Sequence, residues 1–338
     1  MKVLGVLLVL VVLLAGAAAA LVYVPVVPSQ ETFVELPSGT STKTMAVALE
    51  QHGVIRSRYA FLLLRAWKHG RLKAGEYRFV DRASAAEVYD RIARGDVYTR
   101  ALVVPEGYNL FDIARAVEAA GLGSGADFLS AARQNKQLIA PWSPHAASLE
   151  GYLFPDTYLF GHNTTPVQML QVMVRRFNQQ AAKLGLQPSR PETVNCDGPC
   201  RPPVDVVTLA SLVEKEVHFD NERTMAAGVF VNRLRRDMPL QTDPTVIYAA
   251  MLAGRWRGTI YRSDLQFDSP YNTYVHRGMP PGPICSPGAA ALRAAMHPAT
   301  TENLYFVADR TGHTQFSQSL AEHAQQVQSY RQGTAAQP

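Results

Sequence analysis

The stretch Leu209-Ala-Ser-Leu-Val-Glu-Lys-Glu-Val217 places two glutamates, Glu214 and Glu216, inside an otherwise apolar helical run. An ionised carboxyl group surrounded by aliphatic side chains loses hydration, so its pKa rises and it can stay protonated near neutral pH as a general acid. A solvated helix face would hold the same charge at a lower free-energy cost. The placement of the two glutamates therefore needs a reason.

The two glutamates are two positions apart, so on a helix they point in different directions and cannot act as a pair on one face. The residues one and two turns before Glu216 are all aliphatic, namely Leu209, Leu212 and Val213, whereas those before Glu214 include Ala210 and Ser211. Glu216 is therefore the better candidate for a raised pKa. The same pattern also fits a buried salt bridge, with Arg233 or Arg235 as the partner.

Two further carboxylates are candidates for a site. Asp243 precedes Pro244, and such a pair favours the start of a turn or the cap of a helix. Glu150 lies in Leu149-Glu-Gly-Tyr-Leu-Phe-Pro-Asp156, beside aromatic residues that suit sugar rings. The aromatic residues themselves alternate as in a β-strand, so most are predicted to be core: Tyr152, Phe154, Tyr158 and Phe160.

The N-terminal sequence predicts a membrane anchor. Residues Val3–Val27 contain no charged side chain, and a span of the hydrocarbon layer needs roughly 20 residues. Lys2 favours a cytoplasmic N-terminus, which places the remaining chain outside the cytoplasm. The alternative is a cleaved signal peptide, because Ala15–Ala20 consists of small residues. Both readings export the protein.

Export changes the interpretation of the cysteines and the charge. Cys196 and Cys200 lie in a proline-rich loop, residues 188–203, and are candidates for a local disulfide. Cys285 is left over and is predicted to be a buried free thiol. The net charge of +5 would suit nucleic acid in a cytosolic protein. In an exported protein, anionic lipids or cell-wall polymers are the better partners, so we predict no nucleic-acid binding.

The 338 residues, 47% of them hydrophobic and 18% charged, are typical of an ordered protein of several domains.

The sequence contains an internal repeat. Two similar extended segments end in Pro-x-Gly, namely Phe33–Gly39 and Leu102–Gly107. The alignment continues through Met45 with Ile113, Ala46 with Ala114, Leu49 with Val117, Glu50 with Glu118 and Gly53 with Gly121. Each copy predicts a strand, a tight turn, an amphipathic helix and a glycine cap.

The second half of the chain predicts helices and loops. Asp205 is a credible N-cap for a helix to about Val217, and a second helix is expected over Thr224–Arg236. A short helix over Ala289–Met296 and a strand over Tyr305–Val307 precede a polar C-terminal helix. Between them, Tyr271, Asn272, Thr273 and Tyr274 offer uncharged hydrogen-bonding groups, as a neutral polar ligand would require.

An ordered series of motifs resembles the MltG (YceG-like) endolytic murein transglycosylases across essentially the whole chain beyond the anchor. The motifs are Leu209–Glu216, Val231-Asn-Arg-Leu234, Leu240-Gln-Thr-Asp-Pro-Thr-Val-Ile-Tyr248, Ser269-Pro-Tyr-Asn-Thr-Tyr274, Gly278-Met-Pro-Pro-Gly-Pro-Ile284 and Leu304-Tyr-Phe-Val-Ala-Asp309. The resemblance implies a single-pass inner-membrane protein with its bulk in the periplasm, and it implies cleavage within nascent glycan strands. The family's essential glutamate falls on Glu216.

The resulting fold class is α+β: a transmembrane helix, a LysM-like α+β module, then a mixed α/β catalytic domain. The expected boundaries are 1–28 for the anchor, 29–100 for the LysM-like domain, 101–160 for a second repeat-like segment packing on the catalytic domain, and 161–338 for that domain. The 188–203 loop is an insertion. Substrate-binding candidates are Glu150, Glu214, Gln241, Thr242, Asp243, Tyr248, Tyr271, Asn272, Thr273 and Tyr274.

The resemblance implies peptidoglycan glycan strands as the substrate, no metal and no cofactor, with peptidoglycan synthases as candidate partners. Glu216 would serve as acid and then as base in forming a 1,6-anhydro end. Two alternatives stay open. One is a non-catalytic, glycan-binding scaffold that recruits synthases, and the other is a lysozyme-type hydrolase with Asp243 as helper.

Overall fold

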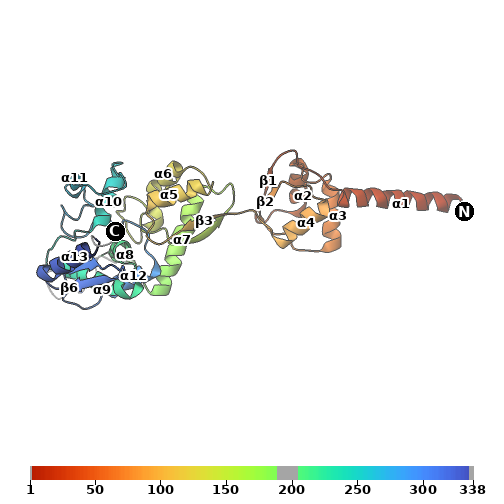
Figure 1. Cartoon of the computed structure of the whole chain (residues 1–338). Coiled ribbons are helices and arrows are strands. Elements are labelled where there is room, and N and C mark those ends of the chain that lie inside the picture. The colour runs from red at the N-terminus through yellow and green to blue at the C-terminus, as the bar shows by residue number, and fades with distance from the viewer. Residues whose placement is uncertain (1, 189–204, 335–338) are drawn as a thin grey trace. The chain divides into compact units, whose positions relative to one another are not determined.

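The structure, a computed structural model, describes residues 2–188 and 205–334. The described chain forms two compact units (Figure 1). Unit 1 holds the residues up to Arg100 together with Leu159–Asn163. Unit 2 holds Ala101–Tyr158 and the described residues from Thr164 onward. The predicted disulfide between Cys196 and Cys200 lies outside the described residues, and Cys285 is confirmed as a buried free thiol.

The first helix, α1 (Lys2–Tyr23), is long and apolar enough over Val3–Tyr23 to cross a membrane. Its side chains are exposed over most of its length, as expected for a helix that is surrounded by lipid. A signal sequence near an N-terminus meets the same criteria of length and composition. The helix is therefore a candidate for either an anchor or a signal.

Unit 1 beyond α1 is a small α+β module around one core. Its elements are β1 (Thr32–Leu36), α2 (Thr42–Gln51), α3 (Arg58–Lys68), β2 (Gly75–Phe79) and α4 (Ala85–Arg94). The strands pair antiparallel, from Thr32 opposite Phe79 to Leu36 opposite Gly75. Val22 at the end of α1 belongs to the same core, so α1 joins the module without a free linker.

The sequence repeat corresponds to a repeated structure. The β1–α2–α3–β2 order of unit 1 recurs as β3 (Arg100–Val104), α5 (Leu110–Ala119), α6 (Gly125–Gln134) and β4 (Asp156–Phe160). Gly39 and Gly107 have φ angles of 85° and 79°, and Gly53 and Gly121 have 68° and 65°, values that favour glycine. The buried positions also correspond: Met45, Ala46 and Leu49 in α2, and Ile113, Ala114 and Val117 in α5.

The remaining elements of unit 2 are mostly helical. They are η1 (Lys136–Ile139), α7 (Pro166–Leu184), α8 (Val206–Glu216), α9 (Asp220–Arg235), α10 (Asp243–Leu252), α11 (Arg262–Leu265), α12 (Ala289–Met296), β5 (Tyr305–Ala308), β6 (Thr314–Ser317) and α13 (Leu320–Thr334). β3 pairs with β4, and β5 pairs antiparallel with β6. Helix α13 packs against this hairpin.

Helix α8 is the central helix of unit 2. The carboxylate of Asp205 caps it by accepting hydrogen bonds from the amides of Val207 and Thr208, both at 3.2 Å. All seven residues from Val207 to Val213 are buried, and α9, α10 and α12 pack around the helix. The helix ends at Glu216 because Val217 adopts an extended conformation. Packing on all sides therefore positions the glutamates at its C-terminal end.

The mixed α+β class is confirmed, while some predicted boundaries differ. Helix α9 begins at Asp220 instead of Thr224, since Asp220 and Glu222 give its first turn the acidic residues that a helix N-terminus favours. The predicted strand covers only Tyr158 and Phe160 of the four alternating aromatics. Tyr152 and Phe154 precede β4, although all four side chains are buried.

Gly228, in the interior of α9, provides a test of this packing. Alanine usually stabilises a helix interior by about 1 kcal/mol relative to glycine. Here a Cβ atom would lie 2.4 Å from the carbonyl oxygen of Ala299. Gly228→Ala is therefore expected to lower the free energy of unfolding by about 1–3 kcal/mol in urea denaturation. Thr224→Ala, at an exposed position of the same helix, is the control and should not destabilise. A Gly228→Ala protein as stable as wild type would show that α9 and Ala299 are not in close contact.

Candidate active site

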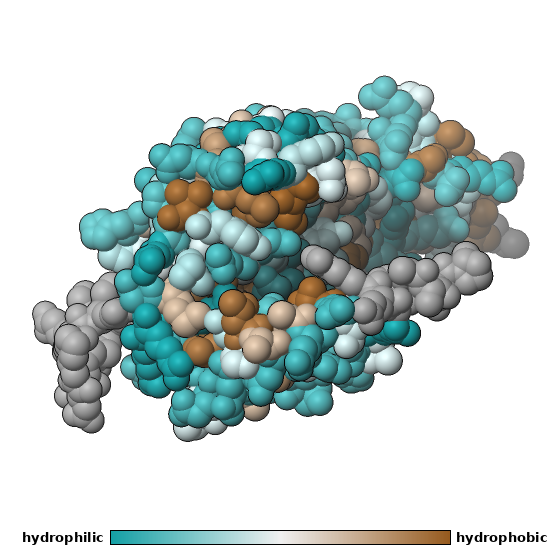
Figure 2. Space-filling view, turned by 60° about the vertical axis from the view of Figure 1, so that its left-hand side comes forward, coloured by the Kyte–Doolittle hydropathy of each residue, from teal (hydrophilic) through white to brown (hydrophobic). Residues whose placement is uncertain are grey.

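A polar cavity of about 320 Å³ opens beside the C-terminal end of α8. Figure 2 shows unit 2 turned forward, with a hollow in this face bordered by hydrophobic and hydrophilic side chains. The residues that line the cavity come from α8, α9, the loop before α10, the start of α10, the loop after α11, β5 and α13: Glu216, Arg233, Leu240, Gln241, Thr242, Asp243, Tyr274, Tyr305, Phe306, Leu320 and His323. Four of the predicted substrate-binding residues thus meet at Glu216, namely Gln241, Thr242, Asp243 and Tyr274.

Glu216 is the titratable group around which the cavity is arranged. The pKa of its carboxyl group is raised to about 7, mainly by burial and also by the nearby charge of Asp243, while the Thr242 hydrogen bond and Arg233 act in the opposite direction. The position at the C-terminus of α8 also disfavours an anion, because the helix dipole is negative there. Glu216 is therefore close to half-protonated at neutral pH, as an acid–base catalyst requires.

The segment before α10 supplies the polar contacts to Glu216. The hydroxyl of Thr242 donates a hydrogen bond to Oε1 of Glu216. Asp243 begins α10, followed by Pro244, and its Oδ1 accepts a hydrogen bond from the Tyr274 hydroxyl at 2.6 Å. The sequence favoured a helix start at Asp243-Pro244. In the structure, Asp243 begins the helix, as predicted, and it also lines the cavity.

Arg233 contributes the positive charge of the cavity. Its Nε donates to the carbonyl oxygen of Leu304 at 2.6 Å and its Nη1 to that of Leu240 at 2.8 Å, and its guanidinium lies 5.2 Å from the centroid of the Tyr305 ring. These contacts fix the side chain between the β5 strand and the loop before α10. Sequence reasoning considered Arg233 only as a salt-bridge partner. It missed Tyr305 and Phe306, although both lie in the Leu304–Asp309 motif, and it had no signal for Leu320 or His323.

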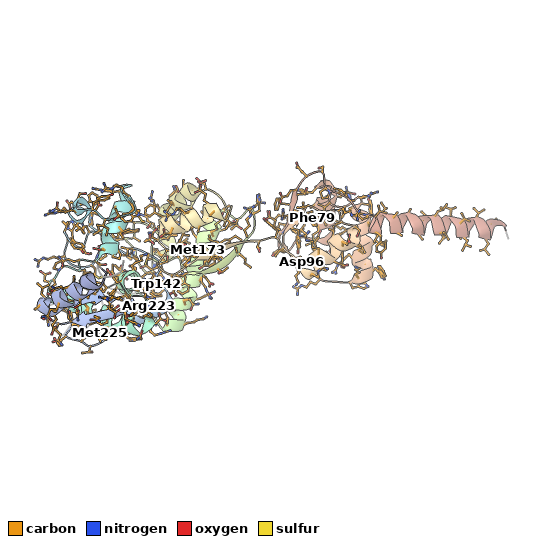
Figure 3. The ribbon with its side chains drawn as sticks, in the orientation of Figure 1. Phe79, Asp96, Trp142, Met173, Arg223 and Met225 are labelled. Carbon is orange, nitrogen blue, oxygen red and sulfur yellow. The ribbon has the colours of Figure 1, made fainter. Side chains whose placement is uncertain are left out.

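Glu214 points away from this cavity, as the helical spacing predicted. Its carboxyl group forms an ion pair with Arg223 on α9 at 3.0 Å, and it accepts a hydrogen bond from the Gly288 amide at 2.9 Å. The side chains of Arg223 and Glu214 are 6% and 5% exposed. Arg223, labelled in Figure 3, is the partner, in place of the Arg233 or Arg235 expected from the sequence. Glu214 and Arg223 together fix the end of α8 against α9 and the start of α12.

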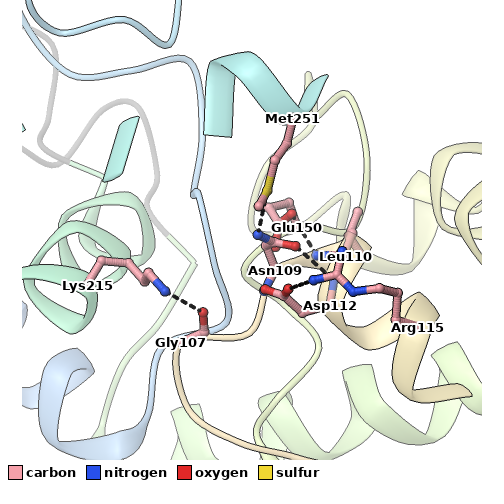
Figure 4. A network of polar contacts seen from close by, with 8 residues as sticks. All are labelled: Gly107, Asn109, Leu110, Asp112, Arg115, Glu150, Lys215 and Met251. Carbon is pink, nitrogen blue, oxygen red and sulfur yellow. Dashed lines mark hydrogen bonds and ion pairs between the residues drawn. The ribbon is translucent and has the colours of Figure 1, made fainter. Parts of the chain in front are cut away.

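The second repeat also contacts the end of α8. Nζ of Lys215 donates a hydrogen bond to the carbonyl oxygen of Gly107 at 3.3 Å (Figure 4). The Gly107 amide in turn donates to the carbonyl oxygen of Ser286 at 2.9 Å. Burial raises the pKa of Glu106, the neighbour of Gly107, and the charge of Glu214 raises it further. The turn after β3 is therefore part of the packing around α8.

The other predicted substrate-binding residues lie behind the cavity wall instead of lining it. Nδ2 of Asn272, which is fully buried, donates to three backbone carbonyl oxygens, those of Asp264, Leu265 and Phe267. The buried Thr273 accepts a hydrogen bond from the Thr242 amide at 3.1 Å. These two residues shape the loop that carries Tyr274 and the turn that carries Thr242.

The buried Glu150 and Tyr248 and the half-buried Tyr271 form a separate cluster. Glu150 accepts a hydrogen bond from the Leu110 amide at the N-terminus of α5, at 3.0 Å (Figure 4). Burial raises the pKa of Glu150 to about 7. The Tyr248 ring packs edge-on to the Tyr271 ring, with centroids 5.0 Å apart. The cluster joins the second repeat to α10, and it does not line the cavity at Glu216.

Within residues 2–188 and 205–334, no group of three or more His, Cys, Asp or Glu side chains is arranged to hold a metal ion. The cavity holds two carboxyl groups, those of Glu216 and Asp243, together with the Thr242 hydroxyl, which donates to Glu216, and the Arg233 guanidinium.

Comparisons with known proteins show which proteins this chain is similar to. The YceG-like family model matches residues 34–329. A Bacillus subtilis (strain 168) protein named endolytic murein transglycosylase is 30% identical over 322 residues, covering 88% of this chain and 84% of that protein. A Streptococcus pneumoniae (strain D39) protein of the same name is 30% identical over 324 residues, and the matched region spans only 57% of that longer protein. A crystal structure of a YceG-like protein from Listeria monocytogenes matches with a TM-score of 0.55 and 31% identity, over 88% of this chain and 99% of that one.

The fold and the matched motifs define a protein of the lytic transglycosylase class of enzymes. The chain belongs to the YceG-like family.

The Glu214–Arg223 ion pair generates a prediction about stability. Removing Arg223 leaves the charge of Glu214 buried and without its ion-pair partner, which costs about 3 kcal/mol. Removing Glu214 costs less, because Arg223 keeps its second ion pair, with Asp220 at 2.9 Å. Arg223→Met is therefore expected to lower the free energy of unfolding by about 3 kcal/mol in urea denaturation, and Glu214→Gln by less. The double variant Glu214→Gln/Arg223→Met should lose less than the sum of the two. Additive losses would mean that the two side chains do not depend on each other.

Proposed function

We propose that this protein is an endolytic murein transglycosylase that cleaves the bond between N-acetylmuramic acid and N-acetylglucosamine inside glycan strands, with Glu216 as the only acid–base catalyst. This cleavage leaves a 1,6-anhydro-N-acetylmuramic acid end on the strand, so the strand cannot be extended further at that end. The names of the relatives support the class of substrate. One observation carries the mechanism: a carboxyl group with a pKa of about 7 faces a polar cavity.

The first step needs a proton. Protonated Glu216 gives its proton to the glycosidic oxygen as the bond between that oxygen and the anomeric carbon of the muramic acid breaks. Positive charge develops on the anomeric carbon and ring oxygen. The substrate's own acetamido group is placed to stabilise this charge, so the reaction does not need a second carboxylate as a nucleophile. The leaving strand carries the transferred proton as a hydroxyl group.

The second step returns the proton. Ionised Glu216 removes the proton from the 6-hydroxyl of the same muramic acid, and that oxygen attacks the anomeric carbon to close the anhydro ring. Glu216 ends protonated, as it began, and no water is consumed. Thr242 donates a hydrogen bond to Glu216 in its ionised state and so stabilises the carboxylate between the two steps.

The other charged groups of the cavity have complementary effects. The carboxylate of Asp243 raises the pKa of Glu216 and provides a negative charge near the developing cation, and the Tyr274 hydroxyl fixes the position of Asp243. Arg233 lowers the pKa of Glu216 and limits the shift. Gln241 and the aromatic side chains Tyr274 and Tyr305 offer hydrogen bonds and apolar faces that suit sugar rings.

The location of the reaction follows from α1. Its 21 apolar residues span roughly 30 Å as a helix, which fits the hydrocarbon layer. Lys2 lies before the span, whereas residues 24–42 contain no Lys or Arg, and this asymmetry favours a cytoplasmic N-terminus. We propose an uncleaved anchor in the inner membrane, with unit 2 and the part of unit 1 beyond α1 in the periplasm. The β1–α2–α3–β2 order supports a LysM-like, glycan-binding role for unit 1, and synthase partners stay a prediction.

Substitution of Glu216 tests the chemistry. Glu216→Gln keeps the shape and removes the proton transfer, so formation of anhydro ends from purified glycan strands should fall by at least about 1,000-fold. Product masses from liquid chromatography and mass spectrometry give the measurement. Glu302→Gln, at an exposed position, is the control with unchanged activity. Wild-type products heavier by one water would instead indicate a hydrolase, and an inactive wild type would indicate a glycan-binding scaffold.

The pH dependence tests the origin of the raised pKa. Because the reaction starts from protonated Glu216, kcat/KM should decline as the pH rises above about 7. Asp243→Asn removes a charge that raises this pKa, so the midpoint of the decline should move down by roughly half a unit. Thr242→Val removes a hydrogen bond that lowers the pKa, so the midpoint should move up. The midpoint is compared instead of the absolute rate, because both residues also line the cavity. Shifts in the same direction would contradict this electrostatic arrangement.

A further inference from the structure

Helix α3 in unit 1 exposes an unusual set of large side chains on one face. Tyr59, Leu63 and Trp67, spaced four residues apart, are 74%, 53% and 68% exposed. The other face of the helix fills the core of unit 1 with Ala60, Phe61 and Leu64. Residues four apart lie on the same side of a helix, so the three exposed residues form a continuous stripe. We call this stripe the α3 face.

Helix α3 lies on the side of unit 1 from which α1 leaves. Figure 1 shows α3 next to the end of α1, and the two helices are in contact. The chain after α1 is held in place, because the Val26 and Ala83 backbones exchange two hydrogen bonds of 2.9 Å. Nη2 of Arg56, two residues before α3, donates to the carbonyl oxygen of Pro25 at 3.4 Å. Helix α3 is therefore fixed close to the point where α1 would leave a bilayer.

The chemistry of the α3 segment matches a lipid surface. Residues 54–75 contain six Arg or Lys and no Asp or Glu, which favours anionic headgroups. Two of these cations are partly neutralised, Arg58 by Glu50 and Lys68 by Asp90, and both pairs remain solvent-accessible. Tyr and Trp are enriched at the level of the headgroups, where the ring is apolar and the polar atom stays hydrated, and leucine suits the acyl boundary below.

We propose that the α3 face docks on the phospholipid bilayer that α1 crosses, so that unit 1 rests on the membrane surface instead of hanging from a tether. This inference rests on the proposed anchor but not on the proposed reaction. The bilayer is favoured over a second protein because helix α3 contacts the membrane-spanning helix and the segment around it, residues 54–75, is basic. A helix with one apolar, aromatic face and basic flanks is the usual form of an interfacial contact.

The test uses the full chain in nanodiscs of phosphatidylcholine and phosphatidylglycerol. The sequence has three tryptophans, so Trp142→Phe/Trp256→Phe leaves Trp67 as the only one. Lipids brominated on their acyl chains should quench Trp67 fluorescence at least about twofold. The matched control, Trp67→Phe/Trp256→Phe, retains Trp142, whose ring packs on Phe177 in unit 2, and it should be quenched little. Equal, weak quenching of Trp67 and Trp142 would overturn the proposal.

A second comparison tests the whole face. Leu63→Glu in the Trp67-only background should reduce the quenching to near the control value, because it places a charge at the acyl boundary. Val80→Glu makes the same kind of change at an exposed position of unit 1 outside α3, and it should leave the quenching unchanged. Protection of Trp67 that depends on two chains in one disc, and not on bromine, would show that a second copy covers the face. A chain that fails to enter the discs would overturn the anchor and the contact together, while leaving the Glu216 chemistry untouched.

Discussion

The burial of α8 on all sides is the constraint on which the site depends. Seven successive residues, Val207–Val213, are buried, so the helix cannot rotate or shift without exposing aliphatic surface to water. Its orientation then fixes the directions of Glu214 and Glu216 at the C-terminal end. A glutamate on a solvated helix could adopt many rotamers and would keep an ordinary pKa. The same packing that makes the helix stable therefore also makes the pKa of one of its carboxyl groups unusual.

The two glutamates of this apolar helix differ in the groups that compensate the desolvation of their carboxyl groups. Glu214 is compensated by a full ion pair with Arg223 and by a backbone amide, which makes it a structural charge. Glu216 receives a hydroxyl donor and a more distant guanidinium, which is too little to hold it ionised. The difference in compensation, and not the difference in burial, separates the structural role from the proposed catalytic one. An acid–base catalyst must be able to gain and lose its proton near neutral pH, and full compensation would prevent that.

Local patterns predicted the fold well, while long-range contacts escaped prediction. The Pro-x-Gly repeat, the Asp205 cap and the separation of the two glutamates depend on spacing within one turn or one helix, so they could be read from the sequence. The ion-pair partner of Glu214 was predicted wrongly, because the choice among the arginines of α9 depends on how two helices cross. Likewise, Tyr248 and Asn272 fall in matched motifs yet lie behind the cavity wall. A motif marks residues that a fold needs, and it does not separate those that line a site from those that shape it.

The second repeat shows how a module can become part of a site. Both repeats share the order strand, helix, helix, strand, but the second belongs to the same compact unit as α8. Its turn accepts a hydrogen bond from Lys215, and its helix α5 donates its N-terminal amide at Leu110 to the buried Glu150. An amide at a helix N-terminus favours a carboxylate, while burial opposes it, so this contact is maintained only where the surrounding packing is complete. The first repeat belongs to unit 1 and does not pack around α8, so its α3 face stays exposed and is suited to the proposed contact with the bilayer. Divergence of two similar modules thus follows from what each one must bury.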